Sequence, residues 1–559
     1  MKLDVALIHP PSVYDFRKIP SYAYMVSEVI PSRYVFDMIP YGFLTLATYL
    51  ERHGFNVTIF NIAAKMLEDI DFDVESYLKG VEADTFGIDL HWMVHAQGAI
   101  EIARLIKRLH PDSKVILGGL SSTIFRHEIM SSYSFVDAVI TGDSGELPLL
   151  KYLEEGPERA PNVIWREDGR IRENSISWVP ESLDDFQIDH GFLLRNLRKT
   201  KDLMLSSPFA SFQEAPIAGV ITVKGCPFDC VTCGGSRYAY GSCFARSKLA
   251  KKSPEAIAEE VEGISNISKV PIFFVGDLRI GGISRLERVS KLLRDLDLEN
   301  ELIFEFFTPP PREVLGALRG ASHNVYLQIS PESPFENVRR AFGRPYANFS
   351  LEKMIRYSKE LDFTRLDLYF MIGLPLQTRD QGTKVAEYFR KMREISKNLD
   401  SFISPLAPFI DPGSRAYSDP ERYGYRLLFR GLEGHRKALL ASHWIYSLNY
   451  ETSWMSRREI AETTLDSYEA LLTEKNIQGI VDDRAYELAI ERVELDREVI
   501  KRIEGGYPID DLWDRMRELA SEYDVSVKKG LSLYPTEGLA ERIRNPLARA
   551  LLKALLIRK

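Results

Sequence analysis

Three of the four cysteines in this 559-residue chain stand close together, at Cys226, Cys230 and Cys233. Their C-x3-C-x2-C spacing puts three thiolates on one loop, and such soft ligands select iron–sulfur clusters. Three thiolates can hold a [4Fe–4S] cube whose fourth iron stays open to another molecule. A structural zinc site is the alternative, and it would need Cys243 or a histidine as a fourth ligand. We expect Cys243 to lie outside the cluster, because a fourth thiolate would block the open iron.

The composition is typical of a large soluble enzyme, with 45% apolar and 27% charged residues. The net charge of −8 argues against a nucleic-acid partner, because phosphate binding needs clustered Lys and Arg. No stretch approaches the roughly 20 apolar residues of a membrane span. The start Met1–Asp4 lacks an apolar signal segment, so we expect a cytoplasmic protein without disulfide bonds.

Strands alternate with helices over residues 1–150, which predicts a doubly wound, Rossmann-like parallel sheet. The expected strands are 5–8, 56–60, 85–90, 114–117 and 136–140, with helices at 42–53 and 96–109. Such sheets bind ligands beyond the carboxyl ends of their strands. A Gly-Gly-x-Ser-Ser turn stands at one of these ends and lets a backbone approach a ligand closely. The candidate ligand-binding residues there are Pro10, Pro11, His91, Trp92, Gly118, Gly119, Ser121, Ser122, Thr123, Gly142, Asp143 and Glu146.

A second series of alternating strands and helices covers residues 215–419 and predicts an open, partial (β/α)6 barrel. The expected strands are 218–223, 272–275, 302–307, 325–329, 366–372 and 402–406, the last ending at 407–409. Barrels of this kind carry their active sites at the carboxyl ends of the strands. Residues 151–214 are expected to be a linker with a small β element, and 420–559 a mainly helical substrate cap.

The cysteine spacing resembles that of radical S-adenosylmethionine (SAM) enzymes. With the Gly-Gly-x-Ser-Ser sheet ahead of it, the chain resembles their cobalamin-dependent (class B) branch over about residues 1–440. The resemblance implies that the three cysteines hold a [4Fe–4S] cluster and that SAM chelates the open iron. It also implies that the sheet residues above bind cobalamin, as methylcobalamin, with the serines and Thr123 lining its nucleotide tail. The residues it implies for SAM are Phe228, Gly276, Asp277, Ser330, Glu332, Gly373 and Leu374.

One feature departs from the cobalamin pattern. The D-x-H-x-x-G sequence of mutases, whose histidine ligates cobalt, is incomplete here, because Asp89 and His91 are present without the glycine. We therefore expect no histidine on cobalt, although ligation by His91 stays open. Trp92 then presents a bulky face below the corrin or packs as a core residue under the sheet.

Two further groups of residues have more than one interpretation. Arg365 precedes a barrel strand and is either a surface residue or a substrate-binding one. In the helical region, aromatic and basic side chains would contact a peptide or form a packed core, and the core is the preferred interpretation. They are Tyr446, Tyr450, Trp454, Arg457 and Arg458.

A narrower resemblance concerns Gly87–Gly98 together with Gly118–Thr123. These segments look like those of a family that contains the glutamine C-methyltransferase of methyl-coenzyme M reductase. The resemblance implies a radical SAM C-methyltransferase that methylates an unactivated sp3 carbon, the Cα of a glutamine in the reductase α subunit, as a post-translational modification in a methanogen. A protein or peptide substrate and an external electron donor follow as partners. A cobalamin radical enzyme that methylates or rearranges a small molecule is one alternative, and a non-catalytic cobalamin or cluster sensor is another.

Overall fold

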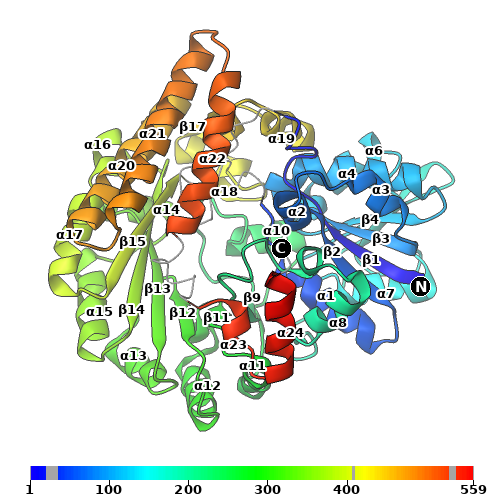
Figure 1. The fold of residues 1–559 in the computed structure, drawn as a ribbon, viewed down its shortest axis with the longest axis horizontal. Helices are drawn as coiled ribbons and strands as arrows, with labels where there is room; N and C mark the ends of the chain where they lie inside the picture. The colour runs from blue at the N-terminus through cyan, green and yellow to red at the C-terminus, as the bar shows by residue number, and fades with distance from the viewer. Residues whose placement is uncertain (1, 20–35, 406–409, 528–536, 558–559) are drawn as a thin grey trace.

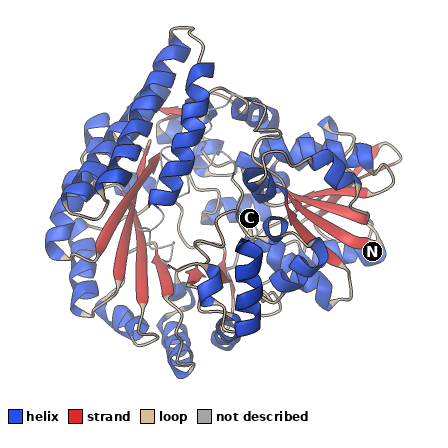
Figure 2. Ribbon diagram, in the orientation of Figure 1, coloured by secondary structure: helices blue, strands red, loops and turns tan. Residues whose placement is uncertain are grey.

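The computed structural model describes residues 2–19, 36–405, 410–527 and 537–557. Two large sheets dominate it, one at each side of the view in Figure 1, and Figure 2 shows that helices surround both. The predicted α/β fold is confirmed: a Rossmann-like sheet in the first part of the chain, a second sheet that is parallel throughout, and helical regions.

The first sheet has the strand order β2-β1-β3-β4-β5-β6-β7. Its parallel part is β1 (Leu3–His9), β2 (Val57–Asn61), β3 (Ala83–Asp89), β4 (Lys114–Gly118) and β5 (Ala138–Ile140). The antiparallel strands β6 (Val163–Glu167) and β7 (Arg170–Asn174) extend it, so the small β element of the expected linker belongs to this sheet. The order reverses between β1 and β3, which is where a doubly wound sheet opens a ligand crevice.

Helices cover both faces of this sheet because its strands are apolar on both sides. One core lies between the strands and α1 (Tyr41–Arg52), α7 (Glu146–Glu155) and α8 (Phe192–Thr200). The opposite core includes α2 (Ile62–Glu68), α3 (Val74–Lys79), α4 (Ala96–Leu109) and α6 (Arg126–Ser132). In α4 the apolar residues recur at helical spacing, and Ile100, Ala103 and Ile106 are fully buried.

The second sheet is all parallel, in the order β15-β14-β13-β12-β11-β8. Its strands are β8 (Ala218–Ile221), β11 (Ile272–Val275), β12 (Leu302–Phe306), β13 (Val325–Glu332), β14 (Arg365–Ile372) and β15 (Leu399–Pro405). All six expected strands are present, although residues 406–409, which include the predicted end of the last strand, lie outside the described part of the chain. Three strands differ from expectation by more than one residue. β13 continues through a bulge to Glu332, β15 begins at Leu399, and β8 ends before a short antiparallel pair, β9 (Val223–Lys224) with β10 (Ala250–Lys251).

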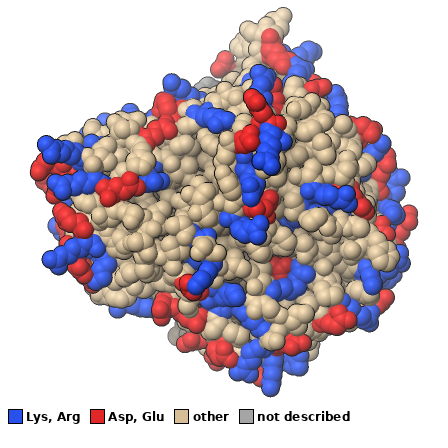
Figure 3. Space-filling model, turned by 180° about the vertical axis from the view of Figure 1, so that it is seen from behind, with Lys and Arg blue, Asp and Glu red and all other residues tan. Residues whose placement is uncertain are grey.

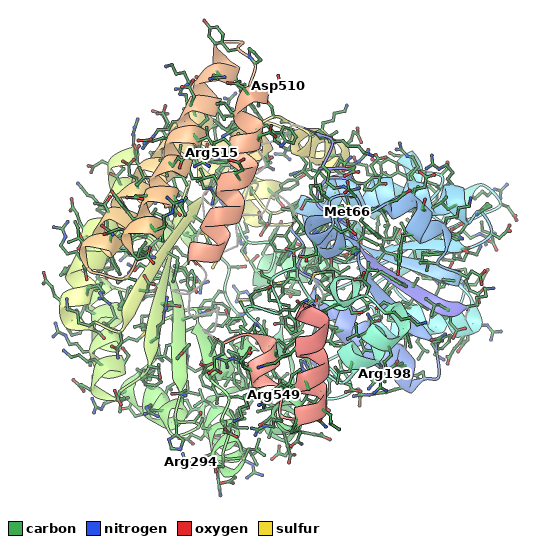
Figure 4. All side chains as sticks on the ribbon, viewed as in Figure 1. Met66, Arg198, Arg294, Asp510, Arg515 and Arg549 are labelled. Carbon is green, nitrogen blue, oxygen red and sulfur yellow. The ribbon has the colours of Figure 1, made fainter. Side chains whose placement is uncertain are left out.

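The long C-terminal helices cover the edge of the barrel sheet. α20 (Arg457–Ile477) packs along β15 and α17 (Val385–Ile395). α21 (Asp483–Glu504) packs on α20, and α22 (Asp510–Val527) packs on α21. Arg515, labelled in Figure 4, ties α22 to Glu491 of α21 at 2.7 Å. An uncovered edge strand would offer unpaired backbone groups to other chains, so α20 protects β15.

One helix beyond the barrel packs on the first domain. α19 (Gly431–Leu439) buries Leu432 and Leu439 in the core that contains α4. Its first turn donates two backbone N–H groups to the Glu128 carboxylate, at 2.9 and 3.0 Å. The segment expected to cap the barrel therefore contributes to the core of the first domain as well.

The chain's last described helices, α23 (Leu539–Arg542) and α24 (Pro546–Ile557), lie by the amino-terminal ends of barrel strands, where Arg542 bonds Glu301 and the Lys269 carbonyl. No helix among the described residues has the length and apolarity to cross a membrane. Lys and Arg are interspersed with Asp and Glu over the face shown in Figure 3.

Candidate active site between two sheets

The cluster loop, residues Gly225–Ser236, follows the first barrel strand and carries the three cysteines. Contacts with the rest of the barrel hold it: Val231 N–H donates to the Phe342 carbonyl at 2.9 Å, and Gly234 N–H to Asp411 Oδ2 at 2.8 Å. Gly343 has φ +118°, and a Cβ there would lie 2.9 Å from the Cys230 Cα. Only glycine permits this close approach.

The donor set of the loop suits a cluster. Burial raises the pKa of all three thiols, that of Cys230 to about 11. A coordinated thiol is deprotonated by the metal, so burial without a metal keeps them protonated. Among the described residues, no group of three or more His, Cys, Asp or Glu side chains, the three cysteines included, is placed to hold a metal ion. Cys243 lies near the end of α10 (Arg237–Phe244), beside Gly413.

A buried, opposite-charge pair lies beside the cluster loop. Glu332, at the end of β13, has φ +67° and is 2% exposed, and its Oε2 has no hydrogen-bond partner. The Arg344 guanidinium lies 3.6 Å from its Oε1 and sits over the rings of Phe228 and Phe307, at 5.4 and 4.8 Å. Burial raises the pKa of Glu332 to about 7. An orphaned carboxylate oxygen in a strained backbone position marks a ligand site, and it fits the hydroxyls of a ribose.

Sequence reasoning missed two charged residues of this region, Arg344 and Glu305. Arg344 Nη1 donates to the Phe307 carbonyl at 2.7 Å, and its buried Nε has no partner. The Glu305 carboxylate accepts the Gly276 N–H, and burial raises the pKa of Glu305 to about 7. The sequence does carry a signal for Glu305, because it is the single acidic residue inside an apolar strand. It carries none for Arg344, which follows a glycine in a loop.

Three predicted SAM residues do not offer free groups. The Asp277 carboxylate is bound by the Arg279 guanidinium through both oxygens. The N–H groups of Gly373 and Leu374 donate to Gln377 Oε1 at 2.8 and 3.2 Å, and Leu374 is fully buried. These groups therefore take part in internal hydrogen bonds, and the assignment of the three residues to SAM stays a prediction. Ser330, by contrast, is half-buried on β13, two residues before Glu332.

Gly373 faces aromatic residues of the C-terminal region. Tyr425 donates its hydroxyl to the Gly373 carbonyl at 3.0 Å, and a Cβ at Gly373 would lie 2.6 Å from the Tyr450 hydroxyl. Tyr450 is fully buried, as the packed-core interpretation expects, and Trp454 packs over Gly424. Arg457 lies over the Tyr446 ring at 4.9 Å.

At the first sheet, the loops after β3 and β4 form one hydrogen-bonded unit. Ser121 donates both its N–H and its hydroxyl to the His91 carbonyl at 3.1 Å. Gly119 has φ +114°, and a Cβ there would lie 2.6 Å from the His91 Cα. A Cβ at Gly118 would meet nothing within 4 Å, so open space lies beside this turn. The space and the glycine pair fit a large flat cofactor with a tail.

Other residues predicted to bind cobalamin take part in the protein's own hydrogen bonds, and their assignment to the cofactor stays a prediction. The Thr123 hydroxyl donates to the Gly119 carbonyl at 2.9 Å, and that of Ser122 to the same oxygen at 2.8 Å. Asp143 forms a buried pair with Arg246. Glu146 Oε1 accepts the Thr45 hydroxyl at 2.8 Å, which leaves only Oε2 unpaired. Pro10 and Pro11 are buried, and Gly142 donates its N–H to Thr123.

Whether His91 can ligate cobalt depends on the partner of Asp89. Its Oδ1 lies 2.9 Å from His9 Nδ1, so the acid that would orient His91 in a mutase pairs with His9 instead. Burial pushes the pKa of Asp89 upward, but the neighbouring histidines outweigh it and the net pKa is lowered. Burial lowers the pKa of His91 to about 4, which keeps its imidazole neutral.

Two further predictions with alternatives can be placed. Trp92 is 46% exposed with its ring against Phe36 at 4.9 Å, so it is not a core residue under the sheet. Arg365 pairs with Asp367 and Asp400, at 2.7 and 2.8 Å. These residues begin β14 and β15, at the end of the barrel opposite the cluster, so Arg365 has a structural position.

Comparisons with known proteins agree with this arrangement. Residues 28–149 match the B12 binding domain family, and residues 220–389 match the radical SAM superfamily. A curated relative, an uncharacterised methyltransferase of Pyrococcus horikoshii, is 23% identical over 63% of this chain and 73% of its own.

Solved structures share the fold. OxsB, a cobalamin-dependent SAM radical enzyme solved with aqua-cobalamin and SAM, has a TM-score of 0.57 at 13% identity, covering 100% of this chain and 80% of its own. TsrM from Kitasatospora setae, a radical SAM methyltransferase solved with cobalamin and a [4Fe–4S] cluster, has a TM-score of 0.53 at 14% identity, covering 77% and 81%.

The chain therefore combines a match to a B12 binding domain with a match to the radical SAM superfamily, and it shares the fold of OxsB and TsrM. The predicted cofactors, cobalamin, a [4Fe–4S] cluster and SAM, agree with these two domain matches.

Proposed function

We propose that this protein is a radical SAM methyltransferase that uses cobalamin to methylate an unactivated sp3 carbon. The observation that carries the proposal is direct contact between the two cofactor regions. Lys224, two residues before Cys226, donates to the Ser144 hydroxyl at 2.9 Å, in the loop after β5. A methyl group on one cofactor can reach a radical made at the other only if the two regions adjoin. The methyltransferase names of TsrM and of the Pyrococcus relative support the same reaction type.

The chain's own residues position the reactants. Cys226, Cys230 and Cys233 would hold the cluster, and Glu332 and Arg344 offer opposite charges to the zwitterionic SAM. Phe228 shields this region, and the buried surroundings exclude water that would quench a radical. The bound cofactors supply the radical and methyl-transfer chemistry itself. Hydrogen-atom abstraction needs no general base, and we assign none.

For the substrate we propose the Cα of a glutamine in a protein, on the resemblance of Gly87–Gly98 and Gly118–Thr123. The α subunit of methyl-coenzyme M reductase is the protein that this resemblance implies. An external electron donor and a cytoplasmic location are part of the same proposal. A small-molecule substrate is the second candidate, and it is favoured by TsrM, a methyltransferase of the same fold that was solved with a tryptophan substrate.

The test incubates reconstituted protein with methyl-labelled SAM, a strong reductant and a glutamine-containing peptide of the reductase. A peptide heavier by one methylene, with 5′-deoxyadenosine and S-adenosylhomocysteine formed together, is the expected result. Deoxyadenosine without S-adenosylhomocysteine would indicate rearrangement and refute the methyltransferase. Absence of both products would favour the sensor. Methylation of a small metabolite but of no peptide would replace the substrate and keep the reaction.

A further inference from the structure

A buried ion pair joins the two cofactor domains. Asp143 lies in the loop after β5, and Arg246 follows α10, the helix that leaves the cluster loop. Both side chains are 2% exposed. The Arg246 Nε and Nη2 both bond the Asp143 carboxylate, and Nη1 donates to the Pro180 carbonyl at 2.8 Å. A forked guanidinium fixes orientation as well as distance, which a lysine cannot do.

Each end of this pair reaches a cofactor region through one more contact. Asp143 follows Gly142, whose N–H donates to the Thr123 hydroxyl at 3.1 Å, and Thr123 belongs to the turn beside the cobalamin crevice. At the other end, the Arg246 Cδ packs on Gly225, where φ is +92° and a Cβ would lie only 3.0 Å from it. Gly225 immediately precedes Cys226. A continuous set of contacts thus runs from the cobalamin turn to the first cluster ligand.

A second contact holds the start of the cluster loop independently of Arg246. Lys224 donates to the Ser144 hydroxyl at 2.9 Å. The two residues ahead of Cys226 are therefore each held against the β5 loop, one directly and one through Arg246. Such convergence is more than the packing of two domains requires, because interdomain surfaces are ordinarily polar and free to move.

We propose that Arg246 is a positioning residue that holds the cluster loop at a fixed distance and angle from the cobalamin crevice. The inference rests on the proposed function, because it concerns two cofactors that act on one substrate. A displacement of about 1 Å can cost on the order of 10²-fold in rate. Loosening Arg246 therefore uncouples SAM cleavage from methyl transfer while both cofactors stay bound.

The experiment compares Arg246→Lys with Arg542→Lys in the reconstituted full chain. Arg542 is a matched control: it is also buried and also binds a carboxylate, Glu301 at 3.0 Å, but beside the amino-terminal ends of the barrel strands. Iron and cobalamin content are measured first. The cluster is then reduced, cobalamin is held as cob(II)alamin, and the magnetic interaction between the two paramagnets is measured by pulsed EPR, which needs no substrate.

Arg246→Lys is expected to keep full cofactor content. It should weaken the magnetic interaction or broaden the distribution of distances between the cluster and the cobalt, whereas Arg542→Lys should leave both as in the wild type. With substrate, the ratio of deoxyadenosine to S-adenosylhomocysteine should rise roughly tenfold, since even a fraction of the 10²-fold loss is measurable. An unchanged interaction in a fully loaded Arg246→Lys protein would overturn the proposal. The EPR measurement tests the role of Arg246 even if the wild type methylates nothing. A failure of the Arg246 proposal can therefore be told apart from a failure of the proposed function.

If Arg246→Lys does not fold, Lys224→Met provides the same test by removing the other contact alone. It should change the magnetic interaction in the same direction and to a smaller extent. Hydrogen exchange of residues 225–236 gives a readout without cofactors: exchange faster than wild type is expected in either variant. Wild-type exchange together with a wild-type magnetic interaction in Lys224→Met would overturn the inference.

Discussion

The two sheets present their carboxyl ends to the same region, but they are built differently there. At the first sheet the polar side chains are used internally, as Thr123 and Ser122 are by the Gly119 carbonyl, and the surface left to a ligand is backbone and space. At the barrel, Glu332 and Arg344 are buried charges whose hydrogen-bonding atoms are not all satisfied. The carboxyl-end edge of the first sheet therefore recognises its ligand by shape, as a large flat cofactor requires. The corresponding edge of the barrel sheet recognises its ligand by charge, as a small amino-acid ligand requires.

The largest effect should follow removal of a cluster ligand. Cys226→Ala, Cys230→Ala and Cys233→Ala are each expected to lose the cluster and all deoxyadenosine formation, because a cube held by three thiolates has none to spare. Cys243→Ala is the control, since Cys243 lies at the far end of α10. Iron content and EPR of the reduced protein are the measurements. A loss of the cluster in Cys243→Ala as complete as in Cys226→Ala would contradict the assignment.

Next in size is the charge-based recognition at the barrel. Glu332→Gln should weaken SAM binding about tenfold or more, because hydrogen bonds to a charged group contribute about 1.5–3 kcal/mol. Calorimetric titration with SAM measures it, and Glu313→Gln, an exposed residue of α13 (Arg312–Arg319), serves as the control. Equal affinity in wild type and Glu332→Gln would remove Glu332 from the site.

The glycine pair tests the shape-based edge. Gly119→Ala should lower the melting temperature, because its Cβ would meet the His91 backbone at 2.6 Å in a left-handed conformation. Gly118→Ala should leave the melting temperature unchanged, since its Cβ meets nothing within 4 Å, but should reduce cobalamin content. Cobalamin retention by Gly118→Ala equal to that of wild type would mean that the cofactor does not use this space.

A smaller effect concerns pH. Glu305 and Glu332 have pKa values raised to about 7 by burial, against 4.5 for an exposed Glu. Between these values the folded protein without cofactors binds more protons than the unfolded chain, so its stability falls as pH rises from about 4.5 to 7. The melting temperature of the cofactor-free protein should show this fall, and Glu305→Gln with Glu332→Gln should flatten it. If the melting temperature of the double variant fell with pH as steeply as that of the wild type, the raised pKa values of Glu305 and Glu332 would be refuted.

The smallest effect is expected at His91. Its imidazole is held neutral, and the nearby acid Asp89 pairs with His9. His91→Ala should therefore keep cobalamin with little spectral change. A clear shift in the visible spectrum of the bound cofactor would establish ligation by His91 and show that the first edge recognises cobalt as well as shape.

The sequence predicted elements better than it predicted which groups are free. All six barrel strands and the five parallel strands of the first sheet follow from apolar runs bounded by glycine and proline, because burial on both faces imposes that pattern. Side-chain partners have no such local signature. Asp143 and Arg246 are 103 residues apart, and Gly373 meets Tyr425 and Tyr450 from another region of the chain. Arg344 lies in a loop, and only the folded structure shows that this loop brings it to the site.

The position of α19 has a consequence for how the protein is made. Leu432 and Leu439 complete a core that otherwise consists of residues from the first half of the chain. During synthesis the amino-terminal domain leaves the ribosome first, yet the apolar face beneath α19 stays uncovered until the whole barrel has been translated. A fragment that ends before the barrel would expose that face permanently, and exposed apolar surface favours aggregation. The two cofactor domains are therefore one unit of expression, and dividing the gene between them would yield an unstable first half.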